Sequence, residues 1–202
     1  MKQRLADYVA DFLVSHGVTD CFSVVGGGAM HLNDALGHKE GLHTTYNHHE
    51  QACAIAAEAY ARLNNKIAAV CVTTGPGGTN AITGVVGGWL DSIPMFVISG
   101  QVRYDTTARY AEKFTNGLHL RSVGDQEYDI VKSVEPMTKY ATMIEDPKDI
   151  RYALEKAWYF SSNLESPNPD ILYELAQAYQ MAGETDKAQQ AYSRIMTDYP
   201  DS

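Results

Sequence analysis

The chain has 202 residues, of which 45% are hydrophobic and 20% are charged, and its formal net charge at pH 7 is −9. An acidic chain of this kind offers no basic surface to a nucleic acid, so that class of partner is not expected. The sequence contains no apolar run of the roughly 18 residues that a membrane-spanning helix needs, and its N-terminus has no signal-peptide pattern. We therefore expect a cytoplasmic protein that binds no membrane.

Hydrophobic periodicity predicts an alternation of helices and strands over the first 160 residues. The expected strands are 21–25, 43–46, 67–73 and 95–99, and the expected helices are 5–16, 30–36, 50–63, 79–90 and 147–160. Residues 103–126 form a polar excursion over the surface, and the fold resumes at 130–134 and 138–143. This order predicts an α/β fold with a doubly wound parallel sheet and helices on both faces.

The composition changes near Ser161. Residues 163–202 hold seven acidic and two basic side chains, which accounts for −5 of the net charge. We expect a domain at 1–162, a linker at 163–168 and a helical hairpin at 169–202. The hairpin resembles one tetratricopeptide repeat in its 34-residue length, and a generic helical hairpin is the alternative. The residues that fit the repeat are Leu172, Leu175, Ala176, Tyr179, Gly183, Ala188, Tyr192 and Pro200.

Three cysteines, Cys21, Cys53 and Cys71, lie far apart in apolar segments and lack the spacing of metal ligands. Buried, reduced thiols are the expected state. The sequence predicts no metal site.

One carboxylate occupies a position typical of functional groups. The strand 43–46 ends in Asn47-His48-His49, and Glu50 begins a helix of small residues. Ligand sites of α/β sheets lie where strands lead into helices. Glu50 is therefore the candidate catalytic group, acting on a bound cofactor, and a helix-capping glutamate is the alternative.

A glycine-rich turn at 73–80 joins a buried strand to the next helix. Backbone N–H groups at such a helix start can bind phosphate. The turn does not fit the dinucleotide pattern, because Asn80 replaces the third glycine, and it lacks the lysine of a P-loop. Tight packing alone is an equal explanation for these glycines.

Several motifs in register resemble the N-terminal, pyrimidine-binding domain of thiamine diphosphate enzymes of the acetolactate synthase type. The resemblance covers residues 1–160. Its motifs are Val24-Val25-Gly26-Gly27-Gly28, His49-Glu50-Gln51, Ala57-Glu58-Ala59-Tyr60-Ala61-Arg62, Thr74-Gly75-Pro76-Gly77-Gly78-Thr79-Asn80, Asp91-Ser92-Ile93-Pro94, Ser99-Gly100-Gln101-Val102, Gln126-Glu127 and Thr138-Lys139-Tyr140.

The resemblance implies roles for individual residues. The glutamate that matches Glu50 hydrogen-bonds N1′ of the cofactor's aminopyrimidine and promotes the imino tautomer, which removes the thiazolium C2 proton. The residues that match the loops around the pyrimidine are Gly26, Gly27, Thr74, Pro76, Gly77 and Asn80, and those near the substrate are Gln101 and Gln126. The implied activity is that of a carboligase or decarboxylase acting on 2-oxo acids. A separate role for His48 or His49 is not expected, since a histidine before this glutamate is common in the family.

The proton-sharing role of Glu50 sets two physical effects against each other. Burial among Ala52 to Ala57 would raise its pKa, whereas the adjacent helix N-terminus would lower it. If the role is correct, burial must dominate.

The sequence also departs from the family. These enzymes hold the diphosphate through Mg²⁺ with a Gly-Asp-Gly…Asn marker in a C-terminal domain, and no such marker occurs here; Gly124-Asp125-Gln126 lacks the second glycine. The Gly-Pro-Val strand expected after Phe160 is replaced by the acidic linker. The resemblance therefore implies that thiamine diphosphate is shared with a diphosphate-binding domain on another polypeptide, and that Mg²⁺ binds only through that domain. The expected partners are a second copy of this chain, because the sites of the family form across chains, or a chain that carries the diphosphate-binding domain. An incomplete or fused domain that serves as a protein-interaction module, with a partner for its C-terminal repeat, is the alternative.

Overall fold

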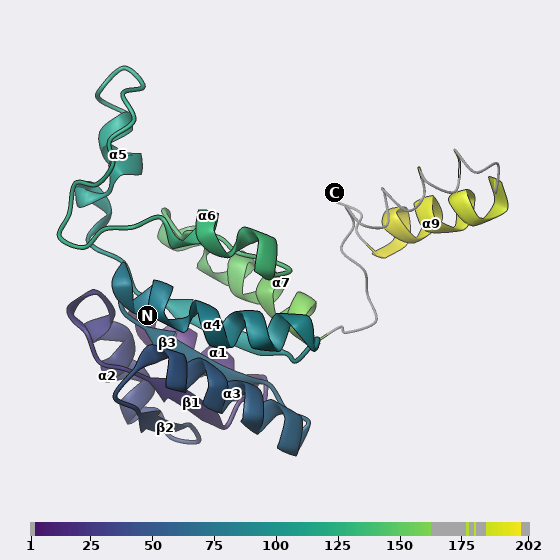
Figure 1. The fold of residues 1–202 in the computed structure, drawn as a ribbon, viewed down its shortest axis with the longest axis horizontal. Helices are drawn as coiled ribbons and strands as arrows, with labels where there is room; N and C mark the ends of the chain where they lie inside the picture. Colours follow the sequence, from purple (N-terminus) through teal and green to yellow (C-terminus); the bar gives the residue numbers. More distant parts are fainter. Residues whose placement is uncertain (1–2, 163–176, 178–179, 181–184, 199–202) are drawn as a thin grey trace. The chain divides into compact units, whose positions relative to one another are not determined.

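The computed structural model describes residues 3–162, 177, 180 and 185–198 (Figure 1). The chain divides into two compact units, Met1–Ser162 and Asn163–Ser202. The first unit carries the sheet and all the candidate site residues.

The sheet of the first unit has four parallel strands in the order β2-β1-β3-β4. Their bounds are β1 Asp20–Ser23, β2 His43–Tyr46, β3 Ala68–Val72 and β4 Met95–Ser99. All four lie where the sequence predicts strands, although β1 and β3 are shorter than expected. The chain leaves β1 and β3 early because the residues that follow them form the turns of the candidate site.

The helices connect and cover these strands. Their bounds are α1 Leu5–Ser15, α2 Met30–His38, α3 Glu50–Asn64, α4 Pro76–Leu90, α5 Ala108–Glu112, α6 Ile130–Val134 and α7 Ile150–Ser162, with 3₁₀ turns η1 Gly27–Ala29, η2 Tyr104–Thr106, η3 Glu135–Met137 and η4 Pro147–Asp149. The main difference from the sequence prediction is α4, which begins at Pro76 instead of Thr79. Proline is favoured in the first turn of a helix, where its missing N–H has no helical partner.

The two faces of the sheet carry separate apolar clusters. Residues Ala68, Val70 and Val72 of β3 pack against α3 and α4. The alternate residues Ala69 and Cys71 pack against α1, α2 and α7 on the other face. Every residue of β3 is buried, as expected for a central parallel strand covered on both sides. The predicted doubly wound α/β fold is confirmed.

Helices α3 and α4 approach each other closely through small residues. A Cβ placed on Gly84 of α4 would lie 2.5 Å from the Cβ of Ala54 and 2.8 Å from the backbone N of Ile55 in α3. Glycine at this point lets the two helix backbones come together. The contact fixes the start of α3, where Glu50 lies, relative to α4.

The expected surface excursion contains η2 and α5, which protrude from the unit (Figure 1). The Glu127 carboxylate accepts hydrogen bonds from the backbone N–H groups of Ala108 at 2.6 Å and Val123 at 2.7 Å. Glu127 thus holds both ends of the excursion. Residues 138–143 form neither helix nor strand, although residues 130–134 form α6.

In the second unit, α9 spans Thr185–Asp198 and buries Ala188. The expected repeat residues Leu172, Leu175, Ala176, Tyr179, Gly183 and Pro200 lie outside the described residues. None of the described helices is long and apolar enough to cross a membrane.

Candidate cofactor site

The candidate residues converge because all four strands are parallel and their carboxyl ends meet at one edge of the sheet. The turn after β1 carries Gly26, the turn after β2 carries Glu50, and the turn after β3 carries Thr74. Gln101 follows β4 at the same edge.

Glu50 is the first residue of α3 and is only 9% exposed. Its Oε2 accepts a hydrogen bond of 3.0 Å from the Nδ2 of Asn80, which lies one turn after Pro76 in α4. No described residue donates a hydrogen bond to the other oxygen, Oε1. The side chain is therefore oriented by one partner and keeps one oxygen available.

Glycines allow the turns beside this carboxyl to pack closely together. A Cβ on Gly77 would lie 2.6 Å from Cγ2 of Thr73 and 3.4 Å from Oε1 of Glu50. A Cβ on Gly26 would lie 2.5 Å from Cβ of Thr73. Only glycine allows the turns after β1 and β3 to approach this closely.

A buried polar network supports the turn after β1. Asn33 of α2 donates from Nδ2 to the Ser23 hydroxyl at 2.9 Å, and that hydroxyl donates to the Cys71 carbonyl at 2.8 Å. Asn33 Oδ1 also accepts from the backbone N–H of Gly26 at 3.4 Å. In addition, Thr73 Oγ1 accepts from the N–H of Gly28 at 3.1 Å. These contacts fix the glycine turn from both sides.

A second chain of contacts links the turn after β3 to the excursion. Thr74 donates from Oγ1 to Oε1 of Gln101 at 2.6 Å, and Gln101 donates from Nε2 to the carbonyl of Tyr128 at 2.9 Å. Gly75 has a φ of +55°, and a Cβ there would lie 2.1 Å from the Gln126 carbonyl. The Gln126 backbone contacts this turn, while the residue as a whole is exposed.

The predicted site residues thus differ in their surroundings. Glu50, Gly77 and Asn80 lie together, and Thr74 and Gln101 are hydrogen-bonded to each other. Gly26 reaches the same turn through Thr73. Gly27 and Pro76 are exposed, and a Cβ on Gly27 would meet no atom within 4 Å.

The histidines before Glu50 have a simpler explanation than proton transfer. Nδ1 of His49 accepts the N–H of Gln51 at 3.1 Å, so this side chain caps α3. His48 is exposed.

Sequence reasoning missed Asn33 and Thr73, together with the Tyr128 carbonyl. Asn33 is a polar residue buried behind the glycine turn that follows β1. Its hydrogen-bond partner Ser23 lies ten residues away, so no local sequence pattern links the two.

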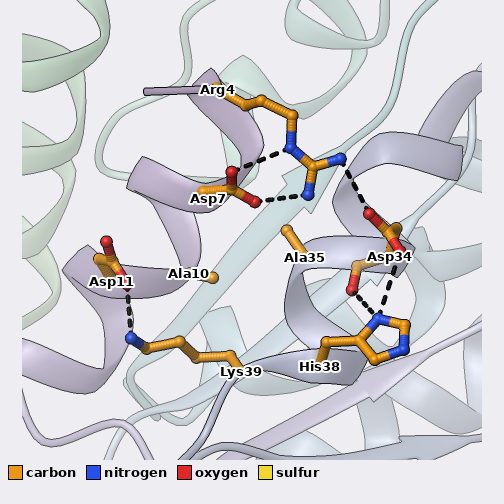
Figure 2. A pocket seen from close by; sticks show the side chains of 8 residues that line it. All are labelled: Arg4, Asp7, Ala10, Asp11, Asp34, Ala35, His38 and Lys39. Carbon is orange, nitrogen blue, oxygen red and sulfur yellow. Dashed lines mark hydrogen bonds and ion pairs between the residues drawn. The ribbon is translucent and has the colours of Figure 1, made fainter. Parts of the chain in front are cut away.

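A separate hollow of about 410 Å³ lies between α1 and α2, on the face of the sheet opposite α3 and α4 (Figure 2). Its charged side chains are paired with each other: Arg4 binds Asp7 at 2.6 Å and Asp34 at 2.9 Å, and Lys39 binds Asp11 at 2.5 Å. The hydrogen bond from Arg4 lowers the pKa of both Asp7 and Asp34. This network joins α1 to α2. Each charged side chain that lines the hollow already has a partner of opposite charge, so none is left unpaired there to bind a ligand.

The residues at the carboxyl edge fit the pyrimidine half of thiamine diphosphate. A buried carboxyl with one free oxygen can exchange a hydrogen bond with a ring nitrogen.

Comparisons with known proteins agree with this geometry. A sequence profile for "Thiamine pyrophosphate enzyme, N-terminal TPP binding domain" matches residues 3–123, and a tetratricopeptide repeat profile matches residues 170–202.

Curated relatives are acetolactate synthases. The large subunit of Buchnera aphidicola (Schizaphis graminum) is 34% identical over 83% of this chain and 27% of its own length. The isozyme 3 large subunit of Escherichia coli is 34% identical over 78% of this chain and 25% of its own length. The chloroplastic enzyme of Arabidopsis thaliana is 30% identical over 78% and 22%. The chain spans about a quarter of the length of these relatives.

Proposed function

Because this chain belongs to the thiamine pyrophosphate enzymes, as their N-terminal binding domain, we propose that it supplies the pyrimidine half of an acetolactate synthase-like site. The observation that carries the proposal is the Glu50 carboxyl, which is buried and oriented by Asn80, and whose Oε1 has no hydrogen-bond donor among the described residues. When bound, thiamine diphosphate supplies a nucleophilic carbon that attacks the carbonyl of a 2-oxo acid.

Glu50 holds the ring nitrogen through Oε1 and moves a proton at that atom. Asn80 keeps the carboxyl in one rotamer, because its Nδ2 binds Oε2. Gly77 and Gly26 allow the ring to lie against the turns, and Thr74 and Gln101 border the side on which a substrate would enter.

The diphosphate half is proposed to come from a domain with the Gly-Asp-Gly…Asn marker, which does not occur in these 202 residues. Mg²⁺ would bind through that half alone.

Calorimetric titration of the full chain with thiamine, and separately with thiamine diphosphate and Mg²⁺, tests the division. If only the pyrimidine site is present, the two ligands bind with affinities that agree within about tenfold, a difference of about 1.4 kcal/mol. Much tighter binding of thiamine diphosphate would contradict it.

Variants of Glu50 separate binding from proton transfer. In Glu50→Gln, the amide oxygen can still accept from Asn80, and the amide nitrogen takes the place of Oε1 and can donate to the ring nitrogen. This variant should therefore bind thiamine as the unmodified chain does. In a reconstituted complex with a diphosphate-binding partner, its turnover of pyruvate should fall about 10²- to 10⁴-fold, the usual contribution of a positioned acid or base. Glu58→Gln, on the same helix and paired with Arg62, is the control and should change neither quantity. Full turnover by Glu50→Gln would refute the catalytic assignment.

A role as an assembly module is the second candidate, favoured by the repeat match at 170–202. It predicts that the chain captures a protein partner through this region and that thiamine does not bind. Removal of residues 163–202 would then abolish partner binding, whereas the enzyme-half proposal requires thiamine binding to persist.

A further inference from the structure

A turn at residues 124–128, at the end of the surface excursion, lies against the candidate cofactor site. A Cβ on Gly75 would lie 2.1 Å from the carbonyl oxygen of Gln126, so only glycine permits this approach. Two residues further on, the carbonyl of Tyr128 accepts a hydrogen bond of 2.9 Å from Nε2 of Gln101. The turn is therefore held against the loop after β3, the same loop that borders the candidate carboxyl.

Gln126 has an uncommon backbone conformation within this turn. Its φ is +58°, in the left-handed region that favours glycine. Two other non-glycine residues in this region, Asn65 and Asn116, are asparagines, which tolerate it better. Strained backbone persists only where the surrounding contacts hold it, and it is concentrated at functional sites. The conformation of Gln126 therefore needs a residue that imposes it.

The side chain of Gln126 is left free by this arrangement. The residue is exposed, and no described residue forms a hydrogen bond with its side-chain amide. A primary amide offers an acceptor oxygen and two N–H donors. It can therefore donate to the carboxylate or the carbonyl oxygen of a 2-oxo acid.

The next residue, Glu127, holds the turn from the side of the excursion. Its Oε1 accepts a hydrogen bond of 2.6 Å from the N–H of Ala108, and its Oε2 accepts one of 2.7 Å from the N–H of Val123. Its own N–H donates to the carbonyl of Gly124 at 3.2 Å, which closes the turn around Gln126. Both carboxylate oxygens are thus occupied by backbone groups, and they tie the turn to two other parts of the excursion.

We propose that Glu127 is a positioning residue for the substrate side of the site. Its carboxylate holds Gln126 in the left-handed conformation, and this conformation presents the free amide of Gln126 to a 2-oxo acid beside the loop after β3. Glu127 acts through Gln126, since backbone N–H groups occupy both of its oxygens. The identity of the substrate rests on the proposed function, whereas the hold of Glu127 on Gln126 does not.

Unfolding midpoints of the full chain test whether Glu127 imposes the conformation. Gln126→Gly and Gln126→Ala both remove the amide, but only glycine adopts a positive φ without strain. The midpoint of Gln126→Gly should therefore exceed that of Gln126→Ala by about 2–4 °C. When Glu127→Gln is added to both variants, one backbone N–H loses its acceptor and the turn can relax. The difference between the two midpoints should then fall by at least half.

Kinetics with pyruvate test the consequence for the substrate. In a complex reconstituted with a diphosphate-binding partner, Glu127→Gln should raise the KM for pyruvate about tenfold and change kcat less than about twofold. Gln126→Ala should raise the KM at least as much. Adding Glu127→Gln to Gln126→Ala should have little further effect, because two residues that act through one group are not additive. The affinity of the chain for thiamine should not change in any of these variants.

Glu112→Gln is the matched control for the change from carboxylate to amide. Glu112 lies in the same excursion, but its carboxylate pairs with the exposed side chain of His119 at 2.9 Å instead of with backbone groups. This variant should leave the KM for pyruvate unchanged. It should also leave unchanged the difference between the midpoints of Gln126→Gly and Gln126→Ala.

Several results would overturn the proposal. Equal midpoints for Gln126→Gly and Gln126→Ala would show that the turn stores no strain, and a difference that survives Glu127→Gln would show that Glu127 does not impose it. Additive effects on the KM, or a lower kcat with an unchanged KM, would show that Glu127 does not act through Gln126. If no variant binds thiamine, the proposed function fails, and the midpoints still decide whether Glu127 positions Gln126.

Discussion

The close approach of α3 and α4 makes a quantitative prediction about two glycines of the same helix. In Gly84→Ala, the new Cβ would lie 2.5 Å from the Cβ of Ala54 and 2.8 Å from the backbone N of Ile55. Backbone atoms cannot move aside locally, so the helices must separate. Overpacking of this kind costs about 1–3 kcal/mol, and the helix propensity of alanine offsets about 1 kcal/mol of it.

Gly87→Ala is the matched control one turn later. The three atoms nearest to its Cβ would all belong to the carboxylate of Glu58, with Oε2 at 3.1 Å, and the end of that side chain can shift by a few tenths of an ångström. The gain in helix propensity then dominates, and stability should be unchanged or rise by up to about 1 kcal/mol.

Thermal unfolding measured by circular dichroism distinguishes the two variants. A change of 1 kcal/mol shifts the midpoint of a domain of this size by about 2–4 °C. We expect a lower midpoint for Gly84→Ala and an equal or higher one for Gly87→Ala. Equal shifts in both variants, or a higher midpoint for Gly84→Ala, would refute the helix contact and the position that it gives to Glu50.

Three further predictions concern the turns, the thiols and the Glu145 carboxylate. Gly75→Ala should lower the unfolding midpoint more than Gly117→Ala; both glycines have positive φ, but only at Gly75 would a Cβ meet an atom, the Gln126 carbonyl. Cys21, Cys53 and Cys71 should resist iodoacetamide until the chain is unfolded, because burial raises the pKa of each thiol, that of Cys71 to about 12; reaction in the native state would contradict this. The hydrogen bond from Tyr104 lowers the pKa of Glu145. The ionised carboxylate therefore stabilises the folded state at pH values above the ordinary glutamate pKa of about 4.3, and this contribution is lost as the pH falls below it. Urea midpoints of Glu145→Gln should therefore depend less on pH in this acidic range, and an unchanged dependence would exclude the effect.

The strands and most helices could be predicted from the sequence because their patterns are local. Apolar runs such as Ala68–Val72 indicate buried strands, and the turns between them follow from glycine positions. Glu50 became a candidate for the same reason, since the strand ends and the helix begins within a few residues of it.

What the sequence could not provide depends on residues far apart in the chain. The pairing of Asn33 with Ser23 and Cys71 joins α2, β1 and β3, and no periodicity indicates it. The same holds for residues 138–143, which look like part of the fold in sequence but form no strand, because strand formation requires a neighbour and the described residues offer none.

Asn80 shows how a residue that excludes one function can support another. In the sequence it breaks the dinucleotide pattern, because a glycine is needed at that position for close helix–strand packing. In the structure, α4 begins at Pro76, so Asn80 lies one turn into the helix and its amide reaches Glu50. Glycine at position 80 would leave Oε2 of a buried carboxyl without its donor, at the cost that attends any unsatisfied buried group. The departure from the nucleotide pattern and the orientation of Glu50 therefore have a single physical cause, an amide placed where a carboxylate needs a donor.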